Sequence, residues 1–136
     1  MANIERFFID RSLGALIVPQ ALRQAGWLLT TMDERYGREV GEGYADVDWI
    51  REATALGEVC LTKDVAIARR PSEAQSVYMN DARVFAFNDG HITGPQMADR
   101  LLLHEHTILR IAGRQHGPYV YSVQSDRVRR LKLSYP

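Results

Sequence analysis

Two short apolar runs that each lead into an aspartate constrain the fold of this chain more than any other feature of its sequence. They occupy residues 7–10 (FFID) and residues 59–64 (VCLTKD). Uninterrupted apolar runs of this length are typical of strands buried on both faces, as in a parallel sheet that helices cover. Asp10 and Asp64 would then lie at the carboxyl ends of two strands, where open α/β sheets bind their ligands.

The rest of the chain alternates between extended and helical patterns. Strands are predicted over residues 6–10, 27–31, 58–62 and 82–88, and helices over residues 12–25 and 47–56. Residues 33–45 predict a loop, and residues 63–75 predict a loop with a short helix that Pro71 interrupts. A long helix from residue 93 or 94 to about residue 113, with Pro95 at its start, precedes a hairpin of residues 119–123 and 128–133.

This alternation predicts an α/β fold whose central sheet is mainly parallel and covered by helices. The 136 residues are enough for one domain with its own core. We expect a single domain over residues 1–136, with its core in residues 5–90 and a C-terminal helix and β-hairpin in residues 91–136.

Composition excludes several classes of protein. With 46% apolar and 25% charged residues, the chain is not expected to be disordered. Its 17 basic residues balance its 17 acidic ones, so a nucleic-acid partner would need a local basic patch. The single cysteine excludes an intrachain disulfide and fits a cytoplasmic location. No apolar run approaches the roughly 20 residues of a membrane span, so no membrane partner is expected.

Four aspartates are the candidate catalytic residues. Asp10 and Asp64 end their strands, Asp46 begins the helix that leads into the second of these strands, and Asp48 lies in the first turn of that helix. Carboxylates that converge repel each other unless a cation lies between them, and Mg²⁺ or Mn²⁺ is the natural occupant. Such an ion can stabilise charge on a phosphate and activate a water, which indicates phosphodiester chemistry.

Each of these aspartates also has a purely structural interpretation. Asp10 or Asp64 could form a turn or a cap after its strand. Asp46 could be a helix N-cap, and Asp48 could complement the helix dipole. The functional interpretation gains weight because all four occur together and in this order.

Basic residues surround the same strand ends. Arg11, Lys63, Arg69 and Arg70 are candidate contacts for RNA phosphates, and the alternative for each is a solvated charged loop. A second basic cluster could bind RNA or a partner, or could simply alternate along an exposed terminal strand. It contains Arg127, Arg129, Arg130 and Lys132.

Other reactive side chains are assigned to the core. His104 shares a helical stripe with apolar residues and is expected to be packed and hydrogen-bonded. Cys60 lies within an apolar strand and is expected to be a small core residue. The sequence contains no Walker-type loop, zinc motif or Gly-x-Ser-x-Gly elbow.

The order of these motifs resembles that of PIN-domain ribonucleases, including the VapC-type toxins of bacterial toxin–antitoxin pairs. In that family an apolar strand ends in Asp, and a later helix led by Asp carries a small residue about two turns on. A strand that closes on Thr-x-Asp follows. The matching segments here are residues 7–10, residues 46–53 (DVDWIREA) and residues 59–64; the FFIDR opening and the tail at residues 117–121 (GPYVY) resemble the compact PIN-like proteins.

The resemblance implies a PIN-like α/β/α sandwich and an endoribonuclease that cleaves single-stranded RNA with Mg²⁺ or Mn²⁺. The family's acidic positions carry over onto Asp10, Asp46 and Asp64 as metal ligands. The resemblance further implies a cognate antitoxin protein that covers the cleft, and a homodimer. The long apolar-striped helix is a candidate dimer surface, although it could equally cover the sheet.

The sequence departs from the family at one position. Longer PIN domains carry a further acidic residue, usually Glu, on a helix between the first two aspartates, where a loop is predicted here. Asp48, Glu39 and Glu42 are the candidates for its role, and Asp48 is favoured.

This departure leaves other hypotheses open. One is a catalytically weak PIN-like module that binds RNA or protein. A response-regulator-like α/β domain is a third hypothesis, and the absence of an adjacent acidic pair in the first strand counts against it.

Overall fold

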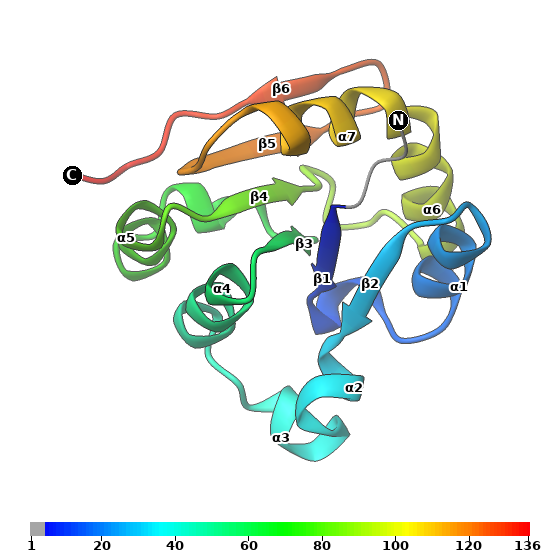
Figure 1. Ribbon diagram of the computed structural model, residues 1–136, viewed down its shortest axis with the longest axis horizontal. Helices are drawn as coiled ribbons and strands as arrows, with labels where there is room; N and C mark the ends of the chain where they lie inside the picture. Colours follow the sequence, from blue (N-terminus) through cyan, green and yellow to red (C-terminus); the bar gives the residue numbers. More distant parts are fainter. Residues whose placement is uncertain (1–4) are drawn as a thin grey trace.

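A six-stranded sheet forms the centre of the computed structural model, which describes residues 5–136 (Figure 1). The strands follow the order β2-β1-β3-β4-β5-β6, with β1 to β5 parallel and β6 antiparallel to β5. Their bounds are β1 Arg6–Ile9, β2 Leu28–Thr31, β3 Glu58–Thr62, β4 Arg83–Ala86, β5 Tyr119–Val123 and β6 Val128–Arg130.

Helices cover both faces of the sheet. On one face α1, α6 and α7 pack against a core that includes Phe7, Val59 and Phe85. On the other face α2, α4 and α5 pack against a core that includes Phe8 and Cys60. The helices are α1 Ile17–Gln24, α2 Met32–Tyr36, α3 Arg38–Glu42, α4 Asp46–Ala55, α5 Pro71–Asn80, α6 Gly94–Leu103 and α7 Glu105–Arg114. The α/β/α sandwich with a mainly parallel sheet that the sequence predicts is thereby confirmed.

The apolar runs are continuous because both sides of each central strand are buried. Successive side chains of a strand point to opposite faces, so Phe7 enters one core and Phe8 the other. Cys60, which pairs with Phe8 in the neighbouring strand β3, is also fully buried. Burial raises the pKa of its thiol to about 12, which fits the predicted core role.

The segment predicted as a loop at residues 33–45 contains two short helices, so that prediction is wrong. Thr31 and Glu34 form a capping box that starts α2, because each side chain bonds the backbone N–H of the other. Gly37, with φ of 80°, then separates α2 from α3. This correction puts helical structure between the first two aspartates.

Three other predicted elements differ from those in the structure. The helix expected over residues 12–25 is a 3₁₀ turn, η1 Arg11–Leu13, followed by the shorter α1. Pro71 does not interrupt a helix but begins α5, where its missing N–H costs no hydrogen bond. The long C-terminal helix is divided at His104, whose Nε2 lies 2.8 Å from the carbonyl oxygen of Gln124.

The sheet has two different edges. Strand β6 forms one of them and carries the exposed side chains of Arg129 and Arg130. Strand β2 forms the other, and Arg23 of α1 donates a hydrogen bond to the carbonyl oxygen of Leu29 there.

Among residues 5–136, no helix has both the length and the apolar composition to span a bilayer.

Candidate functional site

The carboxylate of Asp10 is fixed at the end of β1. Its backbone N–H donates to the carbonyl oxygen of Leu61 at 3.0 Å, which extends the pairing of β1 with β3 by one residue. Its Oδ2 accepts hydrogen bonds from the hydroxyls of Ser12 and Thr62, each at 2.8 Å. The strand pairing therefore determines both the position and the orientation of this side chain.

Asp64 follows β3 and has two structural partners. Its Oδ1 accepts from the backbone N–H of Ala66 at 2.9 Å, so it caps the 3₁₀ turn η2 (Val65–Ala68). Its Oδ2 lies 2.7 Å from Nη1 of Arg70. Asp64 therefore has the capping role that the sequence allowed. Its second oxygen, Oδ2, is left to contact Arg70.

Asp46 is not the N-cap of α4. It is the first helical residue, and Ala45 precedes it as a cap without a side-chain hydrogen bond. Instead, Oδ1 of Asp46 accepts from the indole N–H of Trp49 at 2.9 Å. The buried Trp49 thus holds the carboxylate toward the sheet.

Both burial and neighbouring carboxylates act on the charge of Asp46. Burial of the side chain raises its pKa above the ordinary value, and the hydrogen bond from Trp49 opposes the shift. The negative charges of Asp10, Glu73 and Asp64 raise the pKa further. These four residues are called the carboxylate cluster below.

Glu73 is the member of the carboxylate cluster that the sequence did not predict. It lies in the first turn of α5, which packs beside α4. Its Oε1 is 3.6 Å from Nη1 of Arg70. A helix start recognised at Pro71 would have placed this carboxylate in the first turn of the helix that follows β3.

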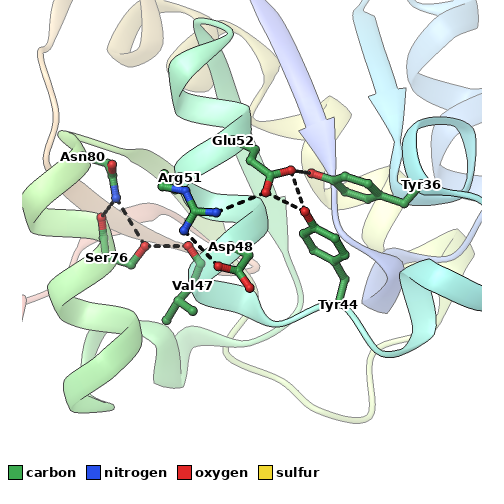
Figure 2. A network of polar contacts seen from close by, with 8 residues as sticks. All are labelled: Tyr36, Tyr44, Val47, Asp48, Arg51, Glu52, Ser76 and Asn80. Carbon is green, nitrogen blue, oxygen red and sulfur yellow. Dashed lines mark hydrogen bonds and ion pairs between the residues drawn. The ribbon is translucent and has the colours of Figure 1, made fainter.

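Asp48 is directed into a different group of side chains (Figure 2). Its Oδ1 accepts from Nη1 of Arg51 at 2.9 Å. Arg51 also contacts Glu52, whose carboxylate accepts hydrogen bonds from the hydroxyls of Tyr36 and Tyr44. The two tyrosine rings stack with their centroids 4.0 Å apart. This network connects α2 and the segment before α4 to α4 itself.

The predicted phosphate contacts are divided between two sides of the carboxylate cluster. Arg11 and Lys63 line a groove of about 730 Å³ together with Ser12, the partner of Asp10. Glu42 of α3 lines the same groove, so a glutamate from a helix does reach this region. Arg69 follows η2 and is exposed. Its neighbour Arg70 contacts Asp64 of the carboxylate cluster.

The donor chemistry of the carboxylate cluster suits a hard divalent cation. Carboxylate oxygens are the ligands that Mg²⁺ prefers, and the ion usually takes only one or two of them besides waters and substrate oxygens. Burial raises the pKa of Asp46, and the negative charges of Asp10, Glu73 and Asp64 add to this shift, so a cation placed among them would be attracted. In the described part of the chain, no three His, Cys, Asp or Glu side chains already stand in ion-binding geometry.

Comparison with known proteins identifies relatives of this chain. Residues 6–89 match the family model described as PIN like domain. "Putative ribonuclease VapC45" of Mycobacterium tuberculosis (strain ATCC 25618 / H37Rv) is 37% identical over 131 residues, which cover 96% of this chain and 94% of that relative. No solved structure matches.

Replacement of Asp46 by Asn is expected to stabilise the metal-free protein at neutral pH. Because the folded protein raises this pKa, ionisation of Asp46 opposes folding above its folded pKa and has no such effect below its ordinary value of 3.8. Asparagine keeps an acceptor for Trp49 and carries no charge. The gain is small because the side chain is only partly buried.

Urea unfolding in EDTA between pH 3 and pH 8 would measure this effect. The difference between the variant and the wild type should grow as the pH rises and should vanish at the acid end. Asp99→Asn, on the exposed side of α6, is the matched control and should show no such trend. A variant that is less stable at every pH would contradict the conclusion that burial and neighbouring charges disfavour the ionised form of Asp46.

Proposed function

Since this chain belongs to the PIN-like domain family, we propose that it is an endoribonuclease that requires Mg²⁺ or Mn²⁺. The observation that carries the proposal is that Asp10 and Asp64 follow the paired strands β1 and β3 and share the hydroxyl of Thr62, while Asp46 lies near enough for their charges to act on it. All three lie within the segment that matches the family model. The name of the relative adds support, because it describes a ribonuclease.

Asp10, Asp46 and Asp64 would hold the metal ion. A bound divalent ion would stabilise negative charge on the scissile phosphate and would lower the pKa of a water nucleophile. The protein's own contribution is to keep the three carboxylates in place. Ser12 and Thr62 orient the first of them, and Trp49 orients the second. Such support of metal ligands commonly changes metal affinity or activity by about 10- to 100-fold.

We assign the RNA strand to the groove beside Asp10. Arg11 and Lys63 line it and offer positive charge for phosphates next to the reaction centre. The chain has no net charge, so these local cations must provide the attraction. Leu16 and Ile17, which are exposed, give the same groove an apolar lining that suits the faces of unpaired bases.

Glu73 is proposed as the fourth carboxylate of the site, in the role that the sequence analysis favoured for Asp48. The reason is their different partners. Glu73 acts on the charge state of Asp46, whereas Asp48 pairs with Arg51 at the surface. Glu42, which shares the groove with Ser12 and Lys63, remains a candidate for the family's helical glutamate.

Removal of a metal-holding carboxylate should abolish cleavage. In Mn²⁺, the purified protein is expected to cleave members of a mixed pool of single-stranded and structured RNAs. Asp10→Asn and Asp64→Asn should each lower kcat/KM by more than about 100-fold, because a neutral amide binds a hard cation poorly. EDTA should abolish cleavage by the wild-type protein.

The control for this experiment is Asp126→Asn, which removes an exposed carboxylate from the turn before β6 and should cleave normally. Cleavage that persists in EDTA or in both active-site variants would refute the metal nuclease. RNA binding without cleavage by any form would favour the catalytically weak binding module. The response-regulator hypothesis is not supported, since the chain belongs to the PIN-like domain family.

The two competing carboxylates can be separated by a pair of isosteric substitutions. Glu73→Gln is expected to lower kcat/KM by about tenfold, and Asp48→Asn by less than about twofold. Both would be compared by single-turnover cleavage of one RNA at saturating Mn²⁺. A larger effect at Asp48 would restore that residue to the site and remove Glu73 from it.

The same family supports a biological role as the toxin of a toxin–antitoxin pair, and we propose this role as well. It requires a small antitoxin that covers the groove, and a cytoplasmic location fits both the RNA substrate and the single buried thiol. Co-expression with the products of adjacent genes should yield a stable complex in which cleavage is suppressed. If no neighbouring product binds or inhibits the nuclease, the toxin role is wrong while the nuclease stands.

A further inference from the structure

Arg70 is the one predicted phosphate contact that faces the carboxylate cluster. Its Nη1 lies 2.7 Å from Oδ2 of Asp64 and 3.6 Å from Oε1 of Glu73. The charges of Asp64, Glu73 and Asp46 all raise the pKa of its guanidinium, after the hydrogen bond to Asp64. Two members of the carboxylate cluster therefore contact this cation, and the charge of a third acts on it.

Arg70 contacts Asp64, one of the proposed metal ligands, so a bound divalent ion and the guanidinium would share this carboxylate. Carboxylates that converge need a positive charge among them, and the guanidinium supplies it. Asp64 turns one oxygen toward Arg70, and in the described residues no three acidic side chains share the geometry of an ion site. In the metal-free protein, the positive charge beside Asp64 and Glu73 is thus that of Arg70.

We infer that Arg70 is an internal counter-ion that competes with the metal ion and is displaced when the ion binds. The displaced guanidinium then contacts an RNA phosphate, for which its planar donors are well suited. This inference rests on the proposed metal-dependent nuclease and assigns a positioning role to one of its residues.

The contacts of Arg70 allow this exchange. Its side chain is 47% exposed and that of Asp64 is 36% exposed, so the pair is solvated and easily broken. Arg70 precedes α5 as its N-cap residue without a side-chain cap bond, so the helix start does not depend on its guanidinium.

Asp64 stays in place when Arg70 leaves. Its other oxygen, Oδ1, accepts from the backbone N–H of Ala66, and its own N–H donates to the hydroxyl of Thr62. Substitution of Arg70 should therefore change the charge of the site without moving the carboxylate. This separation makes the inference testable in a folded protein.

The test is a calorimetric titration of EDTA-treated protein with Mn²⁺, in the absence of RNA. Arg70→Gln should bind Mn²⁺ about tenfold more tightly than the wild type, because one competing positive charge is removed. Arg70→Lys keeps the charge and should stay within about twofold of the wild type. The matched control is Arg69→Gln, which removes the same charge from the adjacent exposed residue and should also stay within about twofold.

Cleavage kinetics add a second measurement, in which the apparent affinities for Mn²⁺ and for RNA should change in opposite directions. Arg70→Gln should reach half-maximal rate at a lower Mn²⁺ concentration than the wild type, and its KM for RNA should rise severalfold. A residue that only supports the fold would not move these two quantities in opposite directions. Unfolding in urea would verify that the variant is folded.

The possible outcomes are distinct. Unchanged or weaker Mn²⁺ binding by Arg70→Gln would overturn the inference, and RNA cleavage by the wild type would leave the nuclease intact. Equal tightening in Arg69→Gln or Arg70→Lys would also overturn it, since the effect would not depend on a charge at this position. Mn²⁺ binding by Arg70→Gln but not by the wild type would support it. No binding by any form would overturn both the inference and the metal-dependent function.

Discussion

The pairing of β1 with β3 is the interaction on which the site depends. It aligns Ile9 with Leu61, and the next N–H, that of Asp10, continues the same ladder. The hydroxyl of Thr62 can then reach the carboxylate of Asp10. A shift of one residue would turn every side chain of the strand to the opposite face, so burial on both sides of the sheet fixes the register. The position of the first carboxylate is thus a result of core packing.

The second half of the site comes from helices, and it carries an electrostatic cost. Asp46 and Glu73 lie in the first turns of the neighbouring helices α4 and α5, and their charges add to those at the strand ends. The protein compensates with one indole N–H and one guanidinium, from Trp49 and Arg70. Both partners are weaker than a divalent ion would be. In the proposed nuclease, some stability of the metal-free protein would thereby be exchanged for affinity toward the cation.

The sequence predicts the sheet side of the site better than the helix side. Apolar runs and strand ends identify Asp10 and Asp64 because a parallel sheet leaves few alternatives for such residues. Asp46 and Asp48 could not be separated in this way. Side chains two residues apart on a helix point about 200° away from each other, so only one of these two aspartates can face the carboxylate cluster. The burial of Trp49 determines which face of α4 is turned toward the core. Glu73 escapes prediction because Pro71, within a mostly polar segment, predicts an interruption of a helix, whereas in the structure it is the start of α5.

The unequal edges of the sheet determine how copies of this protein can meet. An exposed edge offers unpaired backbone groups to any other strand, and charged side chains oppose such addition. Arg129 and Arg130 place like charges along β6, so two such edges repel each other. On β2, the guanidinium of Arg23 already occupies the carbonyl oxygen of Leu29. Both routes by which the sheet could grow into a fibre or a swapped assembly are thereby disfavoured, and any self-association is left to the helical faces.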